Sequence, residues 1–263
     1  MSAENLPRFR VLDVALTGVR LEEATRAALG FCRDGGGGRY VCVFAVDSIL
    51  KCHDDPRLAD IANSSAMTLC DGMPLVLAGR LFGRLDVSRC YGPDFMLAMA
   101  DAGRASGIRH YFYGGCDEDT LRRLRAALSE KFPGMIDAGG EVPPFHPLSD
   151  EEARQTAERI NAASPDVVWV GIGTPKQDFW VSRMRPLLKA PLLVAVGAAF
   201  NFHAGKVPQA PQWMRRNCLE WLYRLCVEPR RLWRRYLIGN PRFVLLVLRQ
   251  LLTRRPHPLG SRA

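Results

Sequence analysis

Five short apolar runs recur over the first 200 residues of the chain, and stretches with helical spacing separate them. Short apolar runs that alternate with helices are typical of βαβ units, whose parallel strands are buried on both faces. The sequence therefore predicts a Rossmann-like α/β fold, with a mostly parallel sheet flanked by helices. The predicted strands are "YVCVFAV" (40–46), "AMTLC" (66–70), "RHYFYGG" (109–115), "DVVWVGIG" (166–173) and "APLLVAVGAAF" (190–200), and two of the predicted helices cover 117–132 and 149–163.

The pattern changes near residue 205, and the positive charge of the chain is concentrated beyond that point. The chain of 263 residues has a formal net charge of +9. Residues 212–263 hold twelve Arg and two Glu, a net charge of +10, so the preceding 211 residues sum to −1. Such a segment favours phosphate-bearing partners, which include nucleic acid, anionic lipid and diphosphates. We predict an α/β domain over 1–205 and a basic, aromatic-rich helical appendage over 206–263. The appendage has a helical pattern at 214–229, followed by a stretch at 230–252 that mixes Arg with Trp, Tyr and Leu.

Several classes of protein are disfavoured by what the sequence lacks. No apolar window reaches the roughly 18 residues that cross a bilayer, and residues 1–10 have no apolar core of a secretory signal. The eight cysteines form no CxxC pair, which fits a reducing cytoplasm. No GxGxxG follows an early strand, as an NAD-dependent oxidoreductase would require, and no nucleic-acid-binding motif accompanies the basic segment. Both classes stay open as alternatives, although we expect a cytoplasmic protein without a nucleic-acid partner.

An acid and a glycine follow the second predicted strand. In open parallel sheets, ligands bind beyond the carboxyl ends of the strands. Asp71 lies at such an end, and Gly72 would let a substrate approach the backbone. Since Pro74 then opens a helical pattern, Asp71 is either the N-cap of that helix or a carboxylate that a reacting hydroxyl can reach.

Two further strand ends are rich in glycine. Gly114 and Gly115 precede a predicted helix, where backbone N–H groups can bind phosphate, although a plain tight turn fits equally. The acids at 117–119 resemble the DxD metal site of sugar transferases, but acids are also ordinary in a first helical turn, and we predict no metal. After Gly173, the segment "TPKQ" (174–177) offers a lysine for a phosphate and a glutamine for sugar or base hydroxyls.

The basic segment also contains aromatic residues. Arginine beside interfacial Trp and Tyr suits a peripheral position at an anionic membrane surface. The alternative is a C-terminal helix that packs on the body and exposes a solvated basic face. The residues concerned are Arg215, Arg216, Arg224, Arg230, Arg231, Arg234 and Arg235, with Trp213, Trp221, Trp233 and Tyr236.

Taken together, five motifs have the order and spacing of the WecG/TagA/CpsF glycosyltransferase family (glycosyltransferase family 26), which the chain resembles over about residues 40–240. The resemblance implies an inverting transferase that moves a sugar from a UDP-sugar to a polyprenyl-diphosphate-linked saccharide, without a metal cofactor. The resemblance also implies that the enzyme acts at the inner face of the cell membrane, in the synthesis of exopolysaccharide, capsule or teichoic acid. The motifs are "DGMPLVLAGRLFG" (71–83), "RCYGPDF" (89–95), "GIGTPKQ" (171–177), "VGAAFNFHAGKVPQAPQWM" (196–214) and "LEWLYRLCVEPRRLWRRYL" (219–237).

The resemblance assigns roles to individual residues. Asp71 takes the position of the catalytic base, and the R-x-x-G-x-D segment corresponds to Arg89, Gly92 and Asp94. We expect the C-terminal arginines to contact the lipid diphosphate, and the sequence leaves a homo-oligomer open. The predicted donor site comprises Gly72, Arg89, Gly92, Asp94, Gly114, Gly115, Gly173, Lys176, Gln177 and Asn201, and the predicted acceptor site comprises Asp47, Ser48, Arg224, Arg230 and Arg231.

The chain also departs from the family pattern at four positions. Val43 and Ala45 stand where the family commonly has Thr and Asn, and Ser48 stands where some members have His. Asn201 replaces an aspartate of the later glycine-rich segment. Because the replaced Thr and Asn are thought to contact reactants, a non-catalytic member of the family is a further alternative. In an active enzyme, Asp47 and Ser48 are the candidates to supply polar contacts in place of the lost Thr and Asn.

Overall fold

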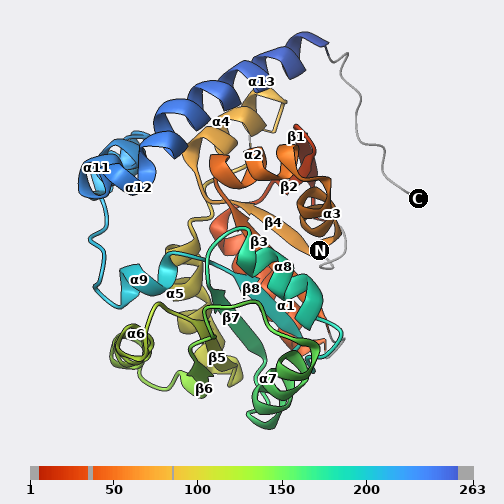
Figure 1. Cartoon of the computed structure of the whole chain (residues 1–263), viewed down its shortest axis with the longest axis vertical. Coiled ribbons are helices and arrows are strands. Elements are labelled where there is room, and N and C mark those ends of the chain that lie inside the picture. The colour runs from red at the N-terminus through yellow and green to blue at the C-terminus, as the bar shows by residue number, and fades with distance from the viewer. Residues whose placement is uncertain (1–5, 35–37, 85, 254–263) are drawn as a thin grey trace.

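The sheet at the centre of the computed structural model, which describes residues 6–34, 38–84 and 86–253, has six strands in the order β4-β3-β8-β7-β5-β6 (Figure 1). Every neighbouring pair is parallel, so all six carboxyl ends meet at one edge. The predicted parallel α/β architecture is therefore confirmed. The strands are β3 (Arg39–Phe44), β4 (Met67–Cys70), β5 (Arg109–Gly114), β6 (Ile136–Glu141), β7 (Val167–Gly171) and β8 (Leu192–Ala195).

Helices cover both faces of the sheet, and alternate side chains of each strand enter opposite hydrophobic cores. On β3, for example, Cys42 and Phe44 belong to one core, whereas Val41 and Val43 belong to the other. Burial on both faces explains why the strands read as continuous apolar runs. One layer contains α2 (Val46–Asp54), α3 (Pro56–Ser64), α7 (Asp150–Ala162) and α8 (Lys176–Met184); the other contains α1 (Leu21–Arg33), α5 (Gly92–Gly103), α6 (Glu118–Lys131) and α9 (Ala199–His203).

The structure differs from the sequence prediction at three places in this body. The hairpin of β1 (Arg8–Val11) and β2 (Val14–Thr17) and the edge strand β6 were not predicted. The strand predicted over 190–200 is too long, because β8 ends at Ala195. Gly197, with a φ of 55°, turns the chain there into α9. Such a left-handed conformation suits glycine and ends the strand.

Beyond α9 the chain forms a series of C-terminal helices that are described as far as Thr253, and residues 254–263 lie outside the described part of the chain. The helix predicted over 214–229 is two helices, because the chain turns at Cys218, which has a φ of 61°. No helix within 6–34, 38–84 or 86–253 has both the length and the hydropathy needed to cross a bilayer. The domain boundary near residue 205 stays a prediction. The helices are α10 (Gln212–Arg216), α11 (Glu220–Val227), α12 (Pro229–Trp233), the π-helical η3 (Arg234–Gly239) and α13 (Asn240–Thr253).

The long helix α13 lies across the body beside α4 (Met73–Leu81), α2 and β1 (Figure 1). Its side chains Phe243 and Val247 enter the core that contains the hairpin. The buried amide of Gln250 accepts a hydrogen bond from the Leu12 N–H at 2.8 Å and donates one to the Arg10 carbonyl at 3.1 Å. Gln250 therefore satisfies two backbone groups of the hairpin turn.

Replacing Gln250 with alanine should lower the free energy of unfolding by about 1–3 kcal/mol, because it leaves both backbone groups without a partner. The measurement is urea unfolding followed by circular dichroism. The control is Arg249→Ala at an exposed neighbouring position, expected to change stability by less than about 0.5 kcal/mol. Equal midpoints for the two variants would show that Gln250 does not hold α13.

Candidate active site

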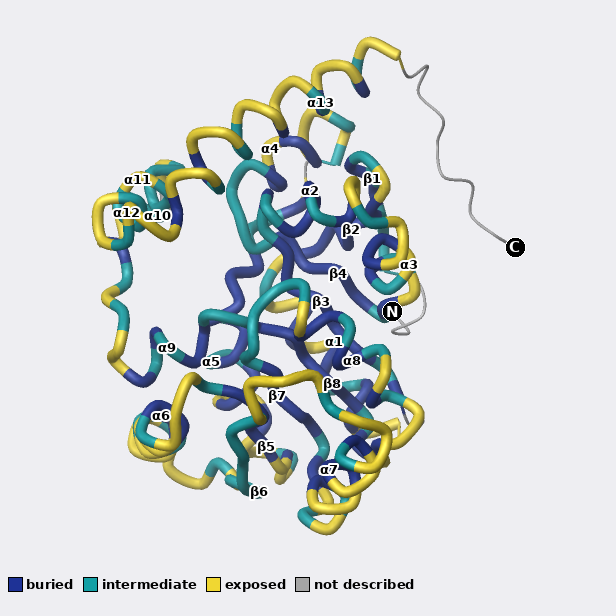
Figure 2. The backbone as a smooth tube through the Cα atoms, in the orientation of Figure 1, coloured by how far each residue is buried: buried dark blue, intermediate teal, exposed yellow. Residues whose placement is uncertain are grey.

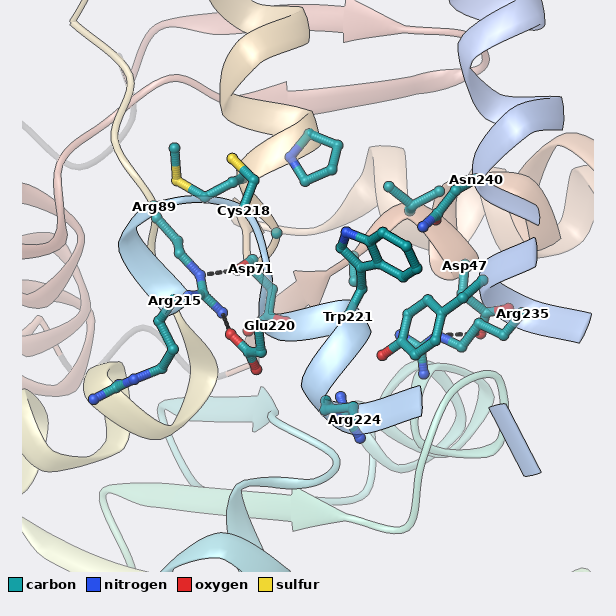
Figure 3. Close-up of a pocket in the computed structure, with 16 residues that line it drawn as sticks. Asp47, Asp71, Arg89, Arg215, Cys218, Glu220, Trp221, Arg224, Arg235 and Asn240 are labelled. Atoms are coloured by element: carbon teal, nitrogen blue, oxygen red, sulfur yellow. Dashed lines mark hydrogen bonds and ion pairs between the residues drawn. The ribbon is translucent and has the colours of Figure 1, made fainter. Parts of the chain in front are cut away.

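Two cavities meet at the carboxyl edge of the sheet. The larger, of about 910 Å³, is lined by residues that follow β3, β7, β5 and β8 and by parts of the C-terminal helices. The smaller, of about 80 Å³, lies between the end of β4 and α11 (Figure 3). Asp71 belongs to the walls of both, so its carboxylate is placed where the two spaces join. The residues shared by both linings are Ala45, Asp47, Asp71, Arg224 and Arg235.

Asp71 is fixed directly beyond β4 by three hydrogen bonds. Its N–H donates to the Phe44 carbonyl at 2.8 Å, and its carbonyl accepts from Arg89 Nε at 2.5 Å. Its carboxylate oxygen Oδ1 accepts from the Gly92 N–H at 2.8 Å. The N-cap of α4 is Gly72, with no side-chain cap. The alternative that Asp71 caps α4 is therefore wrong, and its carboxylate is directed to the first residue of α5, Gly92.

The surroundings of Asp71 raise the pKa of its carboxyl. Burial raises the pKa of its carboxyl, and the nearby Glu220 carboxylate raises it further, while Arg89, the Gly92 N–H and Arg224 lower it. The net effect is a pKa above the ordinary value of an aspartate. A carboxylate whose pKa is raised in this way is a better proton acceptor than a solvated one.

The R-x-x-G-x-D segment joins the body to the C-terminal helices. Arg89 Nη2 contacts Glu220 Oε2 at 2.5 Å, and the Arg89 guanidinium lies 4.0 Å from the centre of the Tyr91 ring. Asp94 lies 3.7 Å from Arg215. Two residues predicted to bind the donor therefore contact α10 and α11, and their contact with a donor stays a prediction.

The glycine-rich end of β5 is shaped by its neighbour β7. A Cβ atom on Gly114 would come within 2.8 Å of the Gly171 backbone, so only glycine fits there. Gly115 lines the larger cavity. Asp117 caps α6 through Thr120 N at 2.7 Å, and Asp119 pairs with Lys206 at 2.8 Å. These acids are occupied by local contacts, and in the described part of the chain no three His, Cys, Asp or Glu residues gather as a metal site.

The "TPKQ" segment also lines the larger cavity, together with Gly173 and Asn201. Gln177 is buried, and its amide oxygen accepts a hydrogen bond from the Gly173 N–H at 3.1 Å. Its amide nitrogen donates to the Thr174 hydroxyl at 3.3 Å. Gln177 therefore holds the loop after β7 in shape, while the exposed Lys176 is free to face a ligand.

The predicted acceptor residues are only partly brought together. Asp47 pairs with Lys51 at 2.8 Å, and Ser48 is buried in the wall of the larger cavity. Arg224 and Arg231 also line that cavity, whereas Arg230 is exposed and lies outside both linings.

Two of the four positions that depart from the family pattern give the larger cavity an apolar stretch of wall. Val43 and Ala45 line the larger cavity with Val196. A Cβ atom built on Gly92 would lie 3.4 Å from Val43 Cγ1 and 3.6 Å from Asp71 Oδ1. Val43 and the Asp71 carboxylate therefore both border Gly92, and the other two departing positions, Ser48 and Asn201, place polar side chains in the lining of the same cavity.

Two lining residues, Glu220 and Arg235, were given no individual role in the sequence prediction. Glu220 contacts Arg89, and Arg235 lies 4.0 Å from Asp47. The available signal was that Glu220 is one of only two acids among residues 212–263. An isolated acid in a basic segment points to a specific partner, although the sequence does not identify Arg89 as that partner.

A parallel α/β sheet with a large cavity at its strand ends is the architecture of enzymes that bind nucleotides. A sequence model of the glycosyl transferase WecG/TagA/CpsF family matches residues 9–257, and the chain belongs to this family. It is 29% identical over 235 residues to the N-acetylglucosaminyldiphosphoundecaprenol N-acetyl-beta-D-mannosaminyltransferase of Bacillus spizizenii, covering 87% of this chain and 86% of that protein. It is 30% identical over 194 residues to the enzyme of the same name from Bacillus subtilis, covering 73% and 72% of the two chains.

These matches confirm the resemblance and the expectation that the protein is a glycosyltransferase. The oxidoreductase alternative is thereby set aside, whereas the absence of a nucleic-acid partner stays a prediction. The roles assigned to single residues, including Asp71, stay predictions.

Replacing Gln177 with leucine should lower the free energy of unfolding by about 1–3 kcal/mol, because the Gly173 N–H loses its partner. Thermal unfolding measures the effect. Gln155→Leu is the matched control, since Gln155 is exposed on α7 and bonds only to Glu151 of its own helix. If both variants unfold like the wild type, Gln177 does not brace the loop.

Proposed function

We propose that the protein is an inverting glycosyltransferase that moves a sugar from a UDP-sugar to a polyprenyl-diphosphate-linked saccharide during synthesis of a bacterial surface polysaccharide. Two relatives support the class of acceptor, since their names specify N-acetylglucosaminyldiphosphoundecaprenol. The observation that carries the proposal is the Asp71 carboxylate, which is held by the Gly92 N–H in the wall of a cavity large enough for a nucleotide sugar.

The chemistry follows from the position of this carboxylate. An acceptor hydroxyl attacks the anomeric carbon from the face opposite the nucleotide, and Asp71 takes its proton. A new carbon–oxygen bond forms as the bond to the UDP oxygen breaks, and UDP leaves with the electron pair, so the anomeric configuration is inverted. General-base help of this kind contributes about 10²–10⁴-fold to the rate.

The departing UDP gains negative charge, which positive groups must stabilise. Lys176, Arg224, Arg231 and Arg235 all line the larger cavity. Guanidinium groups bind diphosphate oxygens through charge-assisted hydrogen bonds. We assign the stabilisation of the leaving group to these side chains, and the proposed reaction needs no metal ion.

Replacing Asp71 with asparagine should reduce transfer by at least about 10²-fold, because an amide cannot accept the proton. The assay pairs a panel of UDP-sugars with a short-chain polyprenyl-diphosphate N-acetylglucosamine, with EDTA present. Thermal-shift titration with UDP should give the same affinity for both proteins, which shows that the donor site is intact.

The control for this variant is Asp60→Asn, which neutralises an exposed acid on α3 and should transfer like the wild type. Wild-type transfer by the Asp71 variant would exclude it as the base. Loss of wild-type activity in EDTA would contradict the metal-free reaction, and a wild type inactive with every donor would favour a non-catalytic family member.

We further propose that α13 and η3 rest on an anionic membrane, where a lipid-linked acceptor resides. α13 runs along the outside of the molecule, with exposed positions along much of its length (Figure 2). Its buried side carries Phe243 and Val247, so the helix has a second, outward apolar face. Each Arg near an anionic membrane surface adds about 1 kcal/mol to the free energy of membrane binding. The exposed apolar residues are Leu237, Ile238, Val244, Leu245, Leu248 and Leu252.

The double variant Leu245→Glu, Leu248→Glu should lose flotation with liposomes that contain phosphatidylglycerol, because it places charge in the apolar face. Its transfer to a short-chain, water-soluble acceptor should stay at the wild-type level. Point substitutions are preferable to truncation, since removing α13 would uncover the core around Phe243.

The matched control adds the same charge at exposed positions of α6 and α7, as Ser129→Glu with Gln155→Glu, and should float normally. If both double variants float equally well, α13 is not the membrane-binding surface.

A further inference from the structure

The first residue of α11, Glu220, is paired with Arg89 beside Asp71. The contact from Arg89 Nη2 to Glu220 Oε2 is 2.5 Å, and the two side chains are only 16% and 14% exposed. Ion pairs withdrawn from water in this way are screened much less by salt than surface pairs. The pair therefore differs from the exposed ion pairs elsewhere on the molecule, such as Arg154 with Glu151.

Arg89 connects this pair to the base. Its Nε donates to the Asp71 carbonyl at 2.5 Å while its Nη2 holds Glu220 (Figure 3). The guanidinium is planar and its donors have fixed directions, so the two contacts constrain one another. The face of the same group lies against Tyr91 at 4.0 Å. A shift of Glu220 is therefore transmitted to the backbone of Asp71.

Glu220 also closes one approach to Asp71. The cavity on its side measures about 80 Å³, and the cavity on the other side about 910 Å³. Ligand pockets usually measure about 300–1,000 Å³, so a sugar reaches Asp71 from the larger cavity. With α11 docked, the smaller cavity excludes substrate from the back of the carboxylate.

Charged groups from several elements surround Asp71. Among the described residues that line the small cavity, Glu220 is the acid contributed by the C-terminal helices. Its negative charge adds to the effect of burial in raising the pKa of Asp71. The surrounding groups are Arg89 and Tyr91 before α5, Asp47 of α2, Arg215 of α10, Glu220 and Arg224 of α11, Arg235 of η3, and the thiols of Cys70 and Cys90.

We infer that Glu220 is a positioning residue for the transfer reaction: by holding Arg89, it docks α11 over Asp71 and fixes the backbone that carries the base. The inference rests on the proposed function for the role of Asp71. The docking itself is a property of the protein without substrate, so it can be tested independently of activity.

Glu220→Gln tests the role in catalysis. The variant keeps the size of the side chain but removes the charge that holds Arg89, and kcat/KM should fall by about tenfold or more, as displaced catalytic groups do. Loss of the neighbouring negative charge lowers the pKa of Asp71. The acid limb of the pH profile of kcat/KM should therefore move to lower pH in Glu220→Gln. In Glu220→Asp, which keeps the negative charge, the acid limb should return to its wild-type pH.

Cys218 reports docking without any substrate, because it lines the small cavity together with Glu220. The reagent is dithionitrobenzoate, used on protein in which the exposed Cys116 and Cys226 are serine. Undocking of α11 in Glu220→Gln should speed the labelling of Cys218 severalfold. Circular dichroism and urea unfolding verify that the body remains folded.

Glu228→Gln is the matched control, since it removes the other acid of residues 212–263, which pairs with Arg231 at 2.5 Å. Its acid limb and its Cys218 labelling should match those of the wild type. If Glu220→Gln also matches the wild type in both measurements, Glu220 has no positioning role.

The two proposals fail in different ways. Faster Cys218 labelling in a protein that transfers no sugar would support docking by Glu220 and contradict the proposed function. An inactive Asp71→Asn variant together with unchanged labelling and an unchanged acid limb in Glu220→Gln would contradict only the role of Glu220.

Discussion

The site depends on the rigid attachment of Asp71 to the end of a buried strand. Its N–H bonds to the Phe44 carbonyl, its carbonyl accepts from Arg89, and its carboxylate accepts from the Gly92 N–H. These contacts join β3, β4 and the start of α5 before any substrate arrives. If Asp71 is the base, as we propose, a carboxylate fixed in this way needs no reorganisation at the moment of proton transfer, which favours efficient catalysis.

The C-terminal helices extend this rigid frame and are attached to the body at several places, including contacts near both ends. At one end, Gln250 bonds to the hairpin turn and Phe243 enters the core. At the other end, Glu220 holds Arg89. Between these attachments, Arg224 and Arg235 are held over the junction of the two cavities. The same segment can therefore face a diphosphate on its inner side and a membrane on its outer side.

The sheet was predictable from the sequence because its central strands are long apolar runs, such as Val167–Gly171. The edge strand β6 was not, because "IDAGGE" (136–141) has one large apolar residue and two glycines. Asp71 was recognisable as a strand-end acid, but its role as an N-cap could not be excluded. The decisive contact is with Gly92, 21 residues further along, and contacts at that separation are determined by tertiary packing.

The departures at Val43 and Ala45 leave the base itself intact. The groups that hold Asp71 are two backbone groups, of Phe44 and Gly92, and the side chain of Arg89. An apolar side chain at residue 43 or 45 removes none of these three groups. What these positions change is the wall of the larger cavity, which offers methyl groups where the family pattern has a hydroxyl and an amide. The substitutions therefore remove polar groups from the space where we propose that the sugars bind, and they leave the contacts that fix the proposed base in place.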